Sequence, residues 1–208
     1  MLAKYLLAAA LIWAAAASAV IPAAAQATAP ATSEPEGISA AEAMDAVMWN
    51  KGTIGGPFAL TDQDGRPRTD ADFAGQVRLV YFGFTHCPDI CPVDLAAIAG
   101  ALNALGDAGA AVQPLFISLD PERDRPNLKI YLDYFSPRIV GLTGDAATTR
   151  AVANAFKIYY REVGEGEAYT IDHTAYTYLF DKDGTYRGFF PPGSDPKQIA
   201  EAVRPLLD

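Results

Sequence analysis

The feature that most constrains the fold is a buried strand that leads straight into a helix. Val77–Phe84 is a continuous run rich in Val, Leu, Tyr and Phe, which predicts a buried strand. Apolar residues spaced three and four apart then predict a helix over about Asp89–Leu105. Pro88 and Pro92 fit only the first turn of this helix or a break before it. A strand followed at once by a helix is typical of α/β domains.

The rest of the chain continues this alternation. An opening hairpin is predicted after Phe58, and a second hairpin precedes a closing helix that Asp195 caps and Pro196 begins. The further predicted strands cover residues 112–119, 139–142, 174–180 and 185–190, and the further predicted helices cover 126–135 and 145–156. The sequence therefore predicts an α/β domain with a central mixed sheet, flanking helices and an N-terminal hairpin.

Two segments with the pattern Asp-x-Asp-Gly raise the question of calcium. They are Asp62–Gly65 and Asp181–Gly184. An EF-hand loop needs a third acidic or amide position before the glycine and a closing glutamate, and neither segment has them. Both segments are therefore predicted to be hairpin turns.

The N-terminus is typical of an export segment. Lys4 supplies a positive start, and Leu6–Ile21 is an uninterrupted run of apolar and small residues. Residues 1–25 are predicted to be a cleaved signal peptide or a retained membrane anchor, since small-residue cleavage sites and a near-spanning length are both present. Residues 26–51 are a tether with a short helix near Ala40–Trp49, and 52–208 form the folded domain. We expect a periplasmic domain, anchored or soluble.

Composition sets limits on partners. The 208 residues include 16 basic and 25 acidic side chains, which gives a net charge of -9 that is spread along the chain. Nucleic acid is excluded as a partner because phosphate binding needs a basic face. The length and the 50% hydrophobic content fit one globular domain with extra segments.

The two cysteines, Cys87 and Cys91, lie at the predicted strand-to-helix junction. A disulfide between them would close a tiny loop and stabilise the fold little. A helix N-terminus favours thiolates, which are the reactive and metal-binding form. Residues four apart on a helix have Cβ atoms ~5–6 Å apart, whereas a relaxed disulfide needs roughly 3.5–4.5 Å. The pair therefore suits a shared metal ion, and a reversible disulfide would need local distortion.

Two thiolates are soft ligands that select Cu(I), zinc or an iron–sulfur cluster. The chain has no further cysteine for a cluster or a four-thiolate zinc site, and it lacks the Cys-x-x-Cys-His haem motif. The candidates for a third ligand are His86, His173, Met44 and Met48. His86 adjoins Cys87 and is expected to pack or support the site, and the methionines are expected on the apolar face of the short helix. The residues alone leave His173 open between a ligand and a structural role.

Several segments resemble the Sco/SenC family in order along the chain. The match runs from about Thr53 to the C-terminus, and the loop Gly164–Ala168 departs from the family pattern. The segments that carry the resemblance are Leu60–Arg66, Phe82–Pro92 (Phe-Gly-Phe-Thr-His-Cys-Pro-Asp-Ile-Cys-Pro), Ser118–Asp124 (Ser-Leu-Asp-Pro-Glu-Arg-Asp), Gly141–Gly144 and Ile171–Thr174. The cysteine motif combined with the Asp-His pair far downstream is highly specific.

The resemblance implies a thioredoxin-like fold and a copper chaperone whose Cu(I) is held by Cys87, Cys91 and His173, with Cu(II) binding left open. It implies a role in maturing the dinuclear copper centre of cytochrome c oxidase. The expected partner is the copper-centre subunit of the oxidase, and other periplasmic copper carriers or thiol reductants are further candidates. Asp172 is expected to orient the histidine or a partner, or to stabilise a turn.

A rival hypothesis is a thiol–disulfide oxidoreductase that keeps the copper-binding cysteines of the oxidase reduced. Cys87 would attack a partner disulfide and Cys91 would resolve the mixed intermediate, so both would be catalytic. The three-residue spacer and the lack of a proline before Thr174 count against a general oxidoreductase. A peroxiredoxin is excluded because its Pro-x-x-x-Thr-x-x-Cys arrangement is missing.

Overall fold

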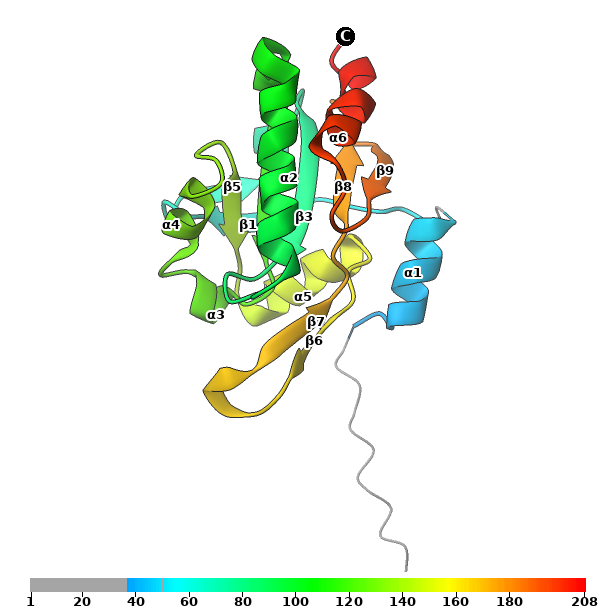
Figure 1. Ribbon diagram of the computed structural model, residues 1–208. Helices are drawn as coiled ribbons and strands as arrows, with labels where there is room; N and C mark the ends of the chain where they lie inside the picture. Colours follow the sequence, from blue (N-terminus) through cyan, green and yellow to red (C-terminus); the bar gives the residue numbers. More distant parts are fainter. Residues whose placement is uncertain (1–36, 50) are drawn as a thin grey trace, which may run out of the picture. The chain divides into compact units, whose positions relative to one another are not determined.

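The computed structural model describes residues 37–49 and 51–208 (Figure 1). The predicted export segment and much of the predicted tether lie outside these residues. In the described part a seven-stranded mixed sheet has the order β2-β1-β5-β4-β3-β8-β9. Strands β3, β4 and β5 are mutually parallel, and the other neighbours pair antiparallel. The strands are β1 (Ala59–Asp62), β2 (Pro67–Thr69), β3 (Val77–Gly83), β4 (Val112–Ser118), β5 (Val140–Thr143), β8 (Thr177–Phe180) and β9 (Tyr186–Phe190).

The helices pack on this sheet. Figure 1 shows α2 and α6 side by side in front of the sheet. The α-helices are α1 (Ala40–Met48), α2 (Ile90–Leu105), α3 (Pro121–Asp124), α4 (Leu128–Asp133), α5 (Ala146–Ala155) and α6 (Pro196–Val203). Short 3₁₀ helices are η1 (Asp70–Phe73), η2 (Gly106–Ala111), η3 (Gly166–Ala168) and η4 (Arg204–Leu206). The predicted mixed sheet with flanking helices and an N-terminal hairpin is confirmed.

The central strand β3 is covered on both faces, as its continuous apolar run predicts. Side chains alternate across a strand. Gly83 faces α2, because a Cβ built on it would lie 2.9 Å from Cys91 Sγ. Phe82 faces the other way and packs on Phe156, which caps the C-terminal end of α5, with ring centroids 5.3 Å apart. The end of β3 is therefore held from both sides at the point where the chain turns toward the cysteines.

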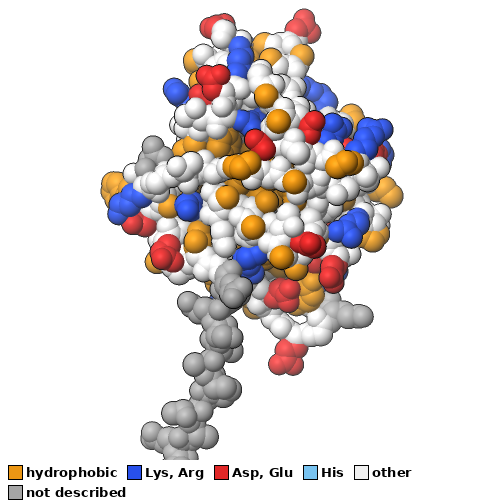
Figure 2. Space-filling model, turned by 180° about the vertical axis from the view of Figure 1, so that it is seen from behind, with side chains coloured by type: hydrophobic (Ala, Val, Ile, Leu, Met, Phe, Trp, Pro, Cys, Tyr) orange, Lys and Arg blue, Asp and Glu red, His pale blue; other side chains and the backbone are white. Residues whose placement is uncertain are grey.

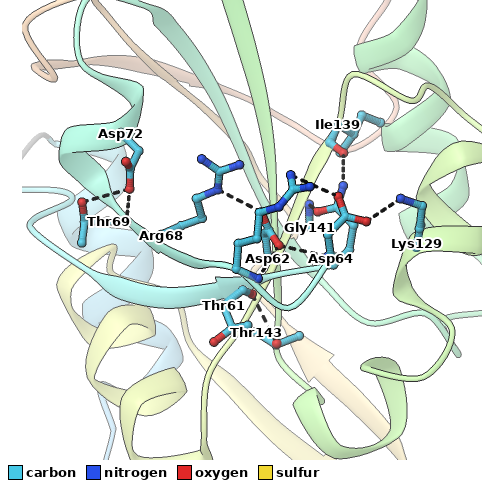
Figure 3. Close-up of polar contacts among 12 residues, drawn as sticks. Thr61, Asp62, Asp64, Arg68, Thr69, Asp72, Lys129, Ile139, Gly141 and Thr143 are labelled. Carbon is cyan, nitrogen blue, oxygen red and sulfur yellow. Dashed lines mark hydrogen bonds and ion pairs between the residues drawn. The ribbon is translucent and has the colours of Figure 1, made fainter.

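The turn between β1 and β2 is organised by the buried side chain of Asp62 (Figure 3). Its Oδ1 accepts hydrogen bonds from the backbone N–H groups of Asp64 and Arg66, both at 2.9 Å. Its Oδ2 accepts from Arg68 Nε at 2.9 Å. Gly65 has a φ of +81°, which glycine adopts readily. The Asp62 carboxylate therefore stabilises the hairpin turn, as predicted. Both of its oxygens already accept hydrogen bonds from protein donors, so they do not form a cation site.

The second Asp-x-Asp-Gly turn, between β8 and β9, repeats this arrangement. Asp181 Oδ1 accepts from the backbone N–H groups of Asp183 at 3.1 Å and Thr185 at 2.9 Å. The N–H of Gly184 donates to the carbonyl of Asp181 at 3.0 Å. The predicted closing hairpin is confirmed.

The helix predicted over residues 126–135 is wrong in its start. The structure instead has two short helices, α3 and α4, that are separated by residues 125–127. Pro121 takes the first position of α3, where a missing N–H costs nothing. The sequence offers Pro126 for the same role, and local patterning does not distinguish the two prolines.

The segment before β8 is a hairpin that the sequence analysis did not predict. Strands β6 (Tyr160–Val163) and β7 (Thr170–His173) pair antiparallel in a separate two-stranded sheet, and His173 lies opposite Tyr160. Gly164 and Gly166, at φ values of +111° and +65°, allow the chain to reverse. Strand β8 begins only at Thr177, so His173 ends a strand of a different sheet.

Charge and hydropathy on the surface fit this architecture. On the face opposite α2, acidic and basic side chains are interspersed, with no basic face there (Figure 2).

In the described ranges one helical stretch, Ile90–Ala111, is long and apolar enough to cross a membrane by length and composition. Half of this stretch is buried inside the domain, and core helices meet the same criterion, so it is weak evidence of a span.

Candidate metal centre

Cys87 lies in the loop between β3 and α2, and Cys91 lies at the start of α2. The N–H of Cys87 donates to the carbonyl of Phe84 at 3.2 Å, and α2 begins at Ile90. Cys91 is therefore in the first turn of α2, as predicted, whereas Cys87 precedes the helix. The expectation that both cysteines lie four residues apart on the same helix is therefore wrong. The proline at position 88 disfavours helical backbone at Cys87, the residue before it.

The sulfur of Cys91 is seated against Gly83. Cys91 is completely buried. A Cβ at Gly83 would lie 2.9 Å from Cys91 Sγ, 2.9 Å from the ring of Tyr81 and 3.1 Å from the ring of Phe116. Such approaches are closer than packed side chains tolerate, so the absence of a side chain at Gly83 creates the space for this sulfur.

His173 reaches the cysteines from the end of β7. Its Nε2 lies 3.8 Å from Cys91 Sγ, although the two residues are 82 positions apart. Its Nδ1 lies 3.0 Å from the carbonyl oxygen of Thr174, which can only accept, so Nδ1 carries the proton and donates. Nε2 is then left with a free lone pair toward the cysteines, the form in which imidazole binds metals.

Aromatic rings hold the imidazole in this orientation. The rings of Phe84 and Tyr81 pack edge-on against His173, with centroids 5.9 Å and 6.5 Å away. Thr174 also ties the end of the hairpin to its neighbour, because its N–H donates to the carbonyl of Tyr159 at 2.9 Å. The structure therefore places His173 beside Cys91, and the Cys87 side chain lies within hydrogen-bonding range of both residues.

The two thiols share one proton unequally. A hydrogen bond from the Cys91 thiol holds the pKa of Cys87 well below its usual range. The neighbouring His173 ring and the backbone N–H groups of Cys91 and Asp89 add to this effect against the opposing effect of burial. The same hydrogen bond, burial and the nearby Cys87 thiolate raise the pKa of Cys91. At neutral pH the reduced pair is therefore one thiolate and one thiol. Neither cysteine is in a disulfide.

Replacing Cys91 by Ala should raise the pKa of Cys87 toward that of a free thiol, since the main hydrogen bond to the thiolate is lost. The check is the pH dependence of iodoacetamide alkylation of the reduced, metal-free protein, followed by mass spectrometry. Wild-type Cys87 should react at a rate that stays flat from neutral into acidic pH, whereas Cys91→Ala should lose reactivity as the pH falls below about 8.5. Cys91→Ser, which keeps a hydroxyl donor, is the matched control and should retain much of the shift. Identical profiles for wild type and Cys91→Ala would refute the assignment.

A buried carboxylate beneath the cysteines was missed by the sequence analysis. Asp94 is 3% exposed, and its Oδ1 accepts from the N–H of Gly193 at 2.8 Å. Burial raises the pKa of Asp94. The hydroxyl of Tyr81 lies beside both Cys91 and Asp94, and burial raises the pKa of Tyr81 as well. The available signal was an acidic residue on the apolar face of the helix, three positions after Cys91.

His86 is engaged away from the two sulfurs. Its Nδ1 lies 3.2 Å from Thr85 Oγ1 and 3.7 Å from Asp124 Oδ1. His86, Asp120 and Asp124 offer ligand atoms within 4.8 Å of one another, as a metal group would. The oxygens of both carboxylates already accept hydrogen bonds from protein donors, which explains the cluster without a metal.

The methionines of α1 do not form its buried face, which consists of Ala43, Ala46 and Val47. Met48 is 52% exposed. Met44 lines a cleft of about 380 Å³ together with His173, and its Sδ accepts from the hydroxyl of Tyr176 at 3.4 Å. The methionines were expected on the apolar face of α1, but the smaller apolar side chains form the face that packs on the domain.

Asp172, which the sequence singled out, and two further aspartates lie around the hairpin and the helix start. Asp172 pairs with Arg161 across the hairpin at 3.4 Å, and both side chains are about half exposed. Asp89 is the N-cap of α2 and makes no side-chain capping hydrogen bond. Asp120 is buried and bonds to Tyr169 and Arg123.

Comparisons with known proteins agree with these observations. The protein is similar to the mitochondrial SCO1 homologue of Mus musculus, with 40% identity over 158 residues that cover 74% of this chain and 56% of the relative. The chain thus spans about half the length of that relative. The solved structure of Bradyrhizobium japonicum ScoI with copper bound is 42% identical, with a TM-score of 0.70 and coverage of 74% of this chain and 99% of that one.

A more distant structure is BsSco, a member of the Sco family of cytochrome c oxidase assembly proteins, in which a disulfide switch was identified. It is 25% identical, with a TM-score of 0.60, and the match covers 76% of this chain and 95% of BsSco. These structural matches confirm the expected thioredoxin-like fold. The SCO1/SenC family model matches residues 47–208, so this chain belongs to the SCO1/SenC family.

Proposed function

We propose that the reduced domain binds one Cu(I) ion between Cys87, Cys91 and His173. The observation that carries this proposal is the position of His173: Nε2 lies 3.8 Å from Cys91 Sγ while Nδ1 donates to Thr174. A lone pair of Nε2 that faces two sulfurs is the arrangement that a metal-binding histidine requires. Copper-bound structures of relatives, including ScoI of Bradyrhizobium japonicum, support copper as the ion.

The spacing of the donor atoms fits a small ion. Metal–sulfur bonds of about 2.3 Å and metal–nitrogen bonds of about 2.0–2.1 Å are usual for zinc and near those for copper. With the two atoms 3.8 Å apart, these lengths give a sulfur–metal–nitrogen angle of about 120°. That angle suits a planar three-coordinate site. Two soft thiolates and one imidazole favour Cu(I) over harder ions.

Loading the ion releases a proton. Cys91 keeps its proton at neutral pH in the metal-free state because its pKa is raised, and a coordinating sulfur must be deprotonated. Copper binding therefore strengthens as the pH rises through the neutral range. The partner's own thiolates can take the ion by ligand exchange, since the histidine lies on a separate hairpin and can leave while the cysteines stay on the main domain.

The biological role follows from the family. BsSco belongs to a family of cytochrome c oxidase assembly proteins, and we infer the same client here: the dinuclear copper centre of the oxidase, in its copper-centre subunit. The N-terminal sequence and the mitochondrial relatives support an extracytoplasmic location, with the domain anchored or released. Other copper carriers and thiol reductants of that compartment are candidate partners.

An anaerobic titration tests the proposal. Cu(I) is added to the reduced protein in competition with a coloured Cu(I) chelator, and wild type should bind one equivalent tightly. Cys87→Ser and Cys91→Ser should each abolish tight binding, because a hydroxyl does not replace a thiolate for Cu(I). Failure of wild type to compete with the chelator would refute the proposal.

The same samples test the oxidoreductase hypothesis. A partly exposed Cys87 thiolate in front of a buried Cys91 thiol is also suited to attack on a partner disulfide. Reduction of insulin disulfides is measured in parallel with the copper titration. A copper chaperone predicts slow reduction and tight copper binding, whereas rapid reduction without tight copper binding would favour the redox function.

A further inference from the structure

The segment Ser118–Asp124, which follows strand β4, lies between the two parts of the chain that carry the candidate ligands. On the cysteine side, Asp124 holds the turn that precedes Cys87. Its Oδ1 accepts from the backbone N–H of Thr85 at 2.9 Å and from Thr85 Oγ1 at 2.7 Å. Asp124 is fully buried, and its Oδ2 accepts from Ser118 Oγ at 2.7 Å. Two hydrogen bonds thus fix the cysteine loop two residues before Cys87.

On the histidine side, the same segment holds the start of β7 through Tyr169. The hydroxyl of Tyr169 donates to Asp120 Oδ1 at 2.8 Å, and its carbonyl accepts from Arg123 Nη1 at 3.1 Å. The guanidinium of Arg123 lies 3.6 Å from the centroid of the Tyr169 ring and pairs with Asp120. Three contacts of different kinds therefore fix the hairpin four residues before His173.

The two sets of contacts are joined inside the segment. The N–H of Asp120 donates to Ser118 Oγ at 3.0 Å, and the N–H of Asp124 donates to the carbonyl of Asp120 at 2.9 Å. The N–H of Leu119 donates to the carbonyl of Gly83 at 2.8 Å, which ties the segment to the end of β3. Hydrogen bonds therefore run without a break from Thr85 to Tyr169.

The hairpin needs such a support. A two-stranded sheet is marginally stable on its own in water, and β6 and β7 pair only with each other in the described structure. At its other strand, Arg150 stacks 3.7 Å from the ring centroid of Tyr160 and donates to its carbonyl at 3.2 Å. The contacts of Tyr169 add a support directly on the strand that carries the histidine.

We infer that Ser118–Asp124 is a platform that sets the distance between the cysteine ligands and the histidine ligand, with Thr85 and Tyr169 as its two positioning residues. The inference rests on the proposed copper site. A ligand set that is already in place binds more tightly because binding does not have to order it. The platform therefore supplies part of the copper affinity without touching the ion.

The experiment uses two variants that each remove one contact. Tyr169→Phe deletes the hydroxyl that reaches Asp120, and Thr85→Val deletes the hydroxyl that reaches Asp124. Each should lower Cu(I) affinity about 10-fold, the lower end of the effect of removing a group that supports a ligand. Tyr134→Phe, a hydroxyl deletion on a tyrosine that is 85% exposed, is the control and should bind like wild type.

Making the same two changes in the His173→Ala protein distinguishes the histidine side of the platform from the cysteine side. Tyr169→Phe should have no further effect on affinity in that background, because Tyr169 acts only through the histidine. Thr85→Val should keep its effect there, because it acts through the cysteines. In the metal-free protein, Tyr169→Phe should speed amide hydrogen exchange in residues 160–163 and 170–173, and Thr85→Val should not.

The outcomes are distinct. Wild-type affinity in Tyr169→Phe, or an equal loss with and without His173, would overturn the platform and leave the copper site intact. Equal affinity of wild type and His173→Ala would refute the three-ligand site itself. The platform is supported if Tyr169→Phe lowers Cu(I) affinity only when His173 is present, while Thr85→Val lowers it with or without His173. Amide hydrogen exchange should change only in Tyr169→Phe.

Discussion

His173→Ala should weaken Cu(I) binding by about 100-fold or more. The change removes the only nitrogen donor that the described structure places beside the two sulfurs, at 3.8 Å from Cys91 Sγ. Loss of a group that merely supports a ligand already costs about 10- to 100-fold in metal affinity, so loss of the ligand should cost at least the upper end of that range. Chelator competition under anaerobic conditions measures the effect.

The other histidine provides the matched control for this prediction. His86 adjoins Cys87 in sequence but bonds with Thr85 and lies near Asp124. His86→Ala should therefore change the affinity by less than about threefold, since Thr85 keeps its own hydrogen bonds to Asp124. A large loss in His86→Ala with none in His173→Ala would reverse the ligand assignment.

Gly83→Ala should destabilise the domain and also weaken copper binding. The added Cβ would meet Cys91 Sγ and the Tyr81 ring, each at 2.9 Å, and both groups are fully buried. Overpacking of a core typically costs about 1–3 kcal/mol. For a domain of this size each kcal/mol lowers Tm by about 2–4 °C. Thermal and urea unfolding of the reduced, metal-free protein measure the loss.

The copper effect of Gly83→Ala is separable from the loss of stability. The displaced sulfur of Cys91 should lower Cu(I) affinity even at temperatures where the variant is fully folded. Gly56→Ala is the control, because its Cβ would make only an ordinary contact of 3.7 Å with Ala155 and its backbone is unstrained. An unfolding free energy for Gly83→Ala within about 0.5 kcal/mol of wild type would show that the Cys91 sulfur does not depend on the space left by Gly83.

Local patterns in the sequence predicted most of the fold. The buried run of β3 and the helical periodicity of α2 placed the strand-to-helix junction, and with it the two cysteines, because both signals lie within short segments. The predicted helix, about Asp89–Leu105, agrees with α2 to within one residue, and only the treatment of Cys87 as a helical residue was wrong. The Asp-Gly turns were equally local, since Asp62 bonds to the N–H groups two and four residues on.

Local sequence patterns could not predict the position of His173 or the contacts that hold its hairpin. His173 reaches Cys91 because a second, two-stranded sheet carries it there, and no sequence pattern predicted that hairpin. From the residues alone the histidine was undecided, and the family resemblance was what implied its role. The contact of Tyr169 with Asp120 spans 49 positions and has no local signature at all.

The most direct test of the three-ligand site is X-ray absorption at the copper edge of the Cu(I)-loaded protein. Two sulfur scatterers at about 2.3 Å and one nitrogen scatterer at about 2.0 Å are expected for wild type. The nitrogen contribution should disappear in His173→Ala and remain in His86→Ala. A wild-type spectrum with sulfur alone, or a nitrogen contribution that survives in His173→Ala, would contradict the assignment of Cys87, Cys91 and His173 as the copper ligands.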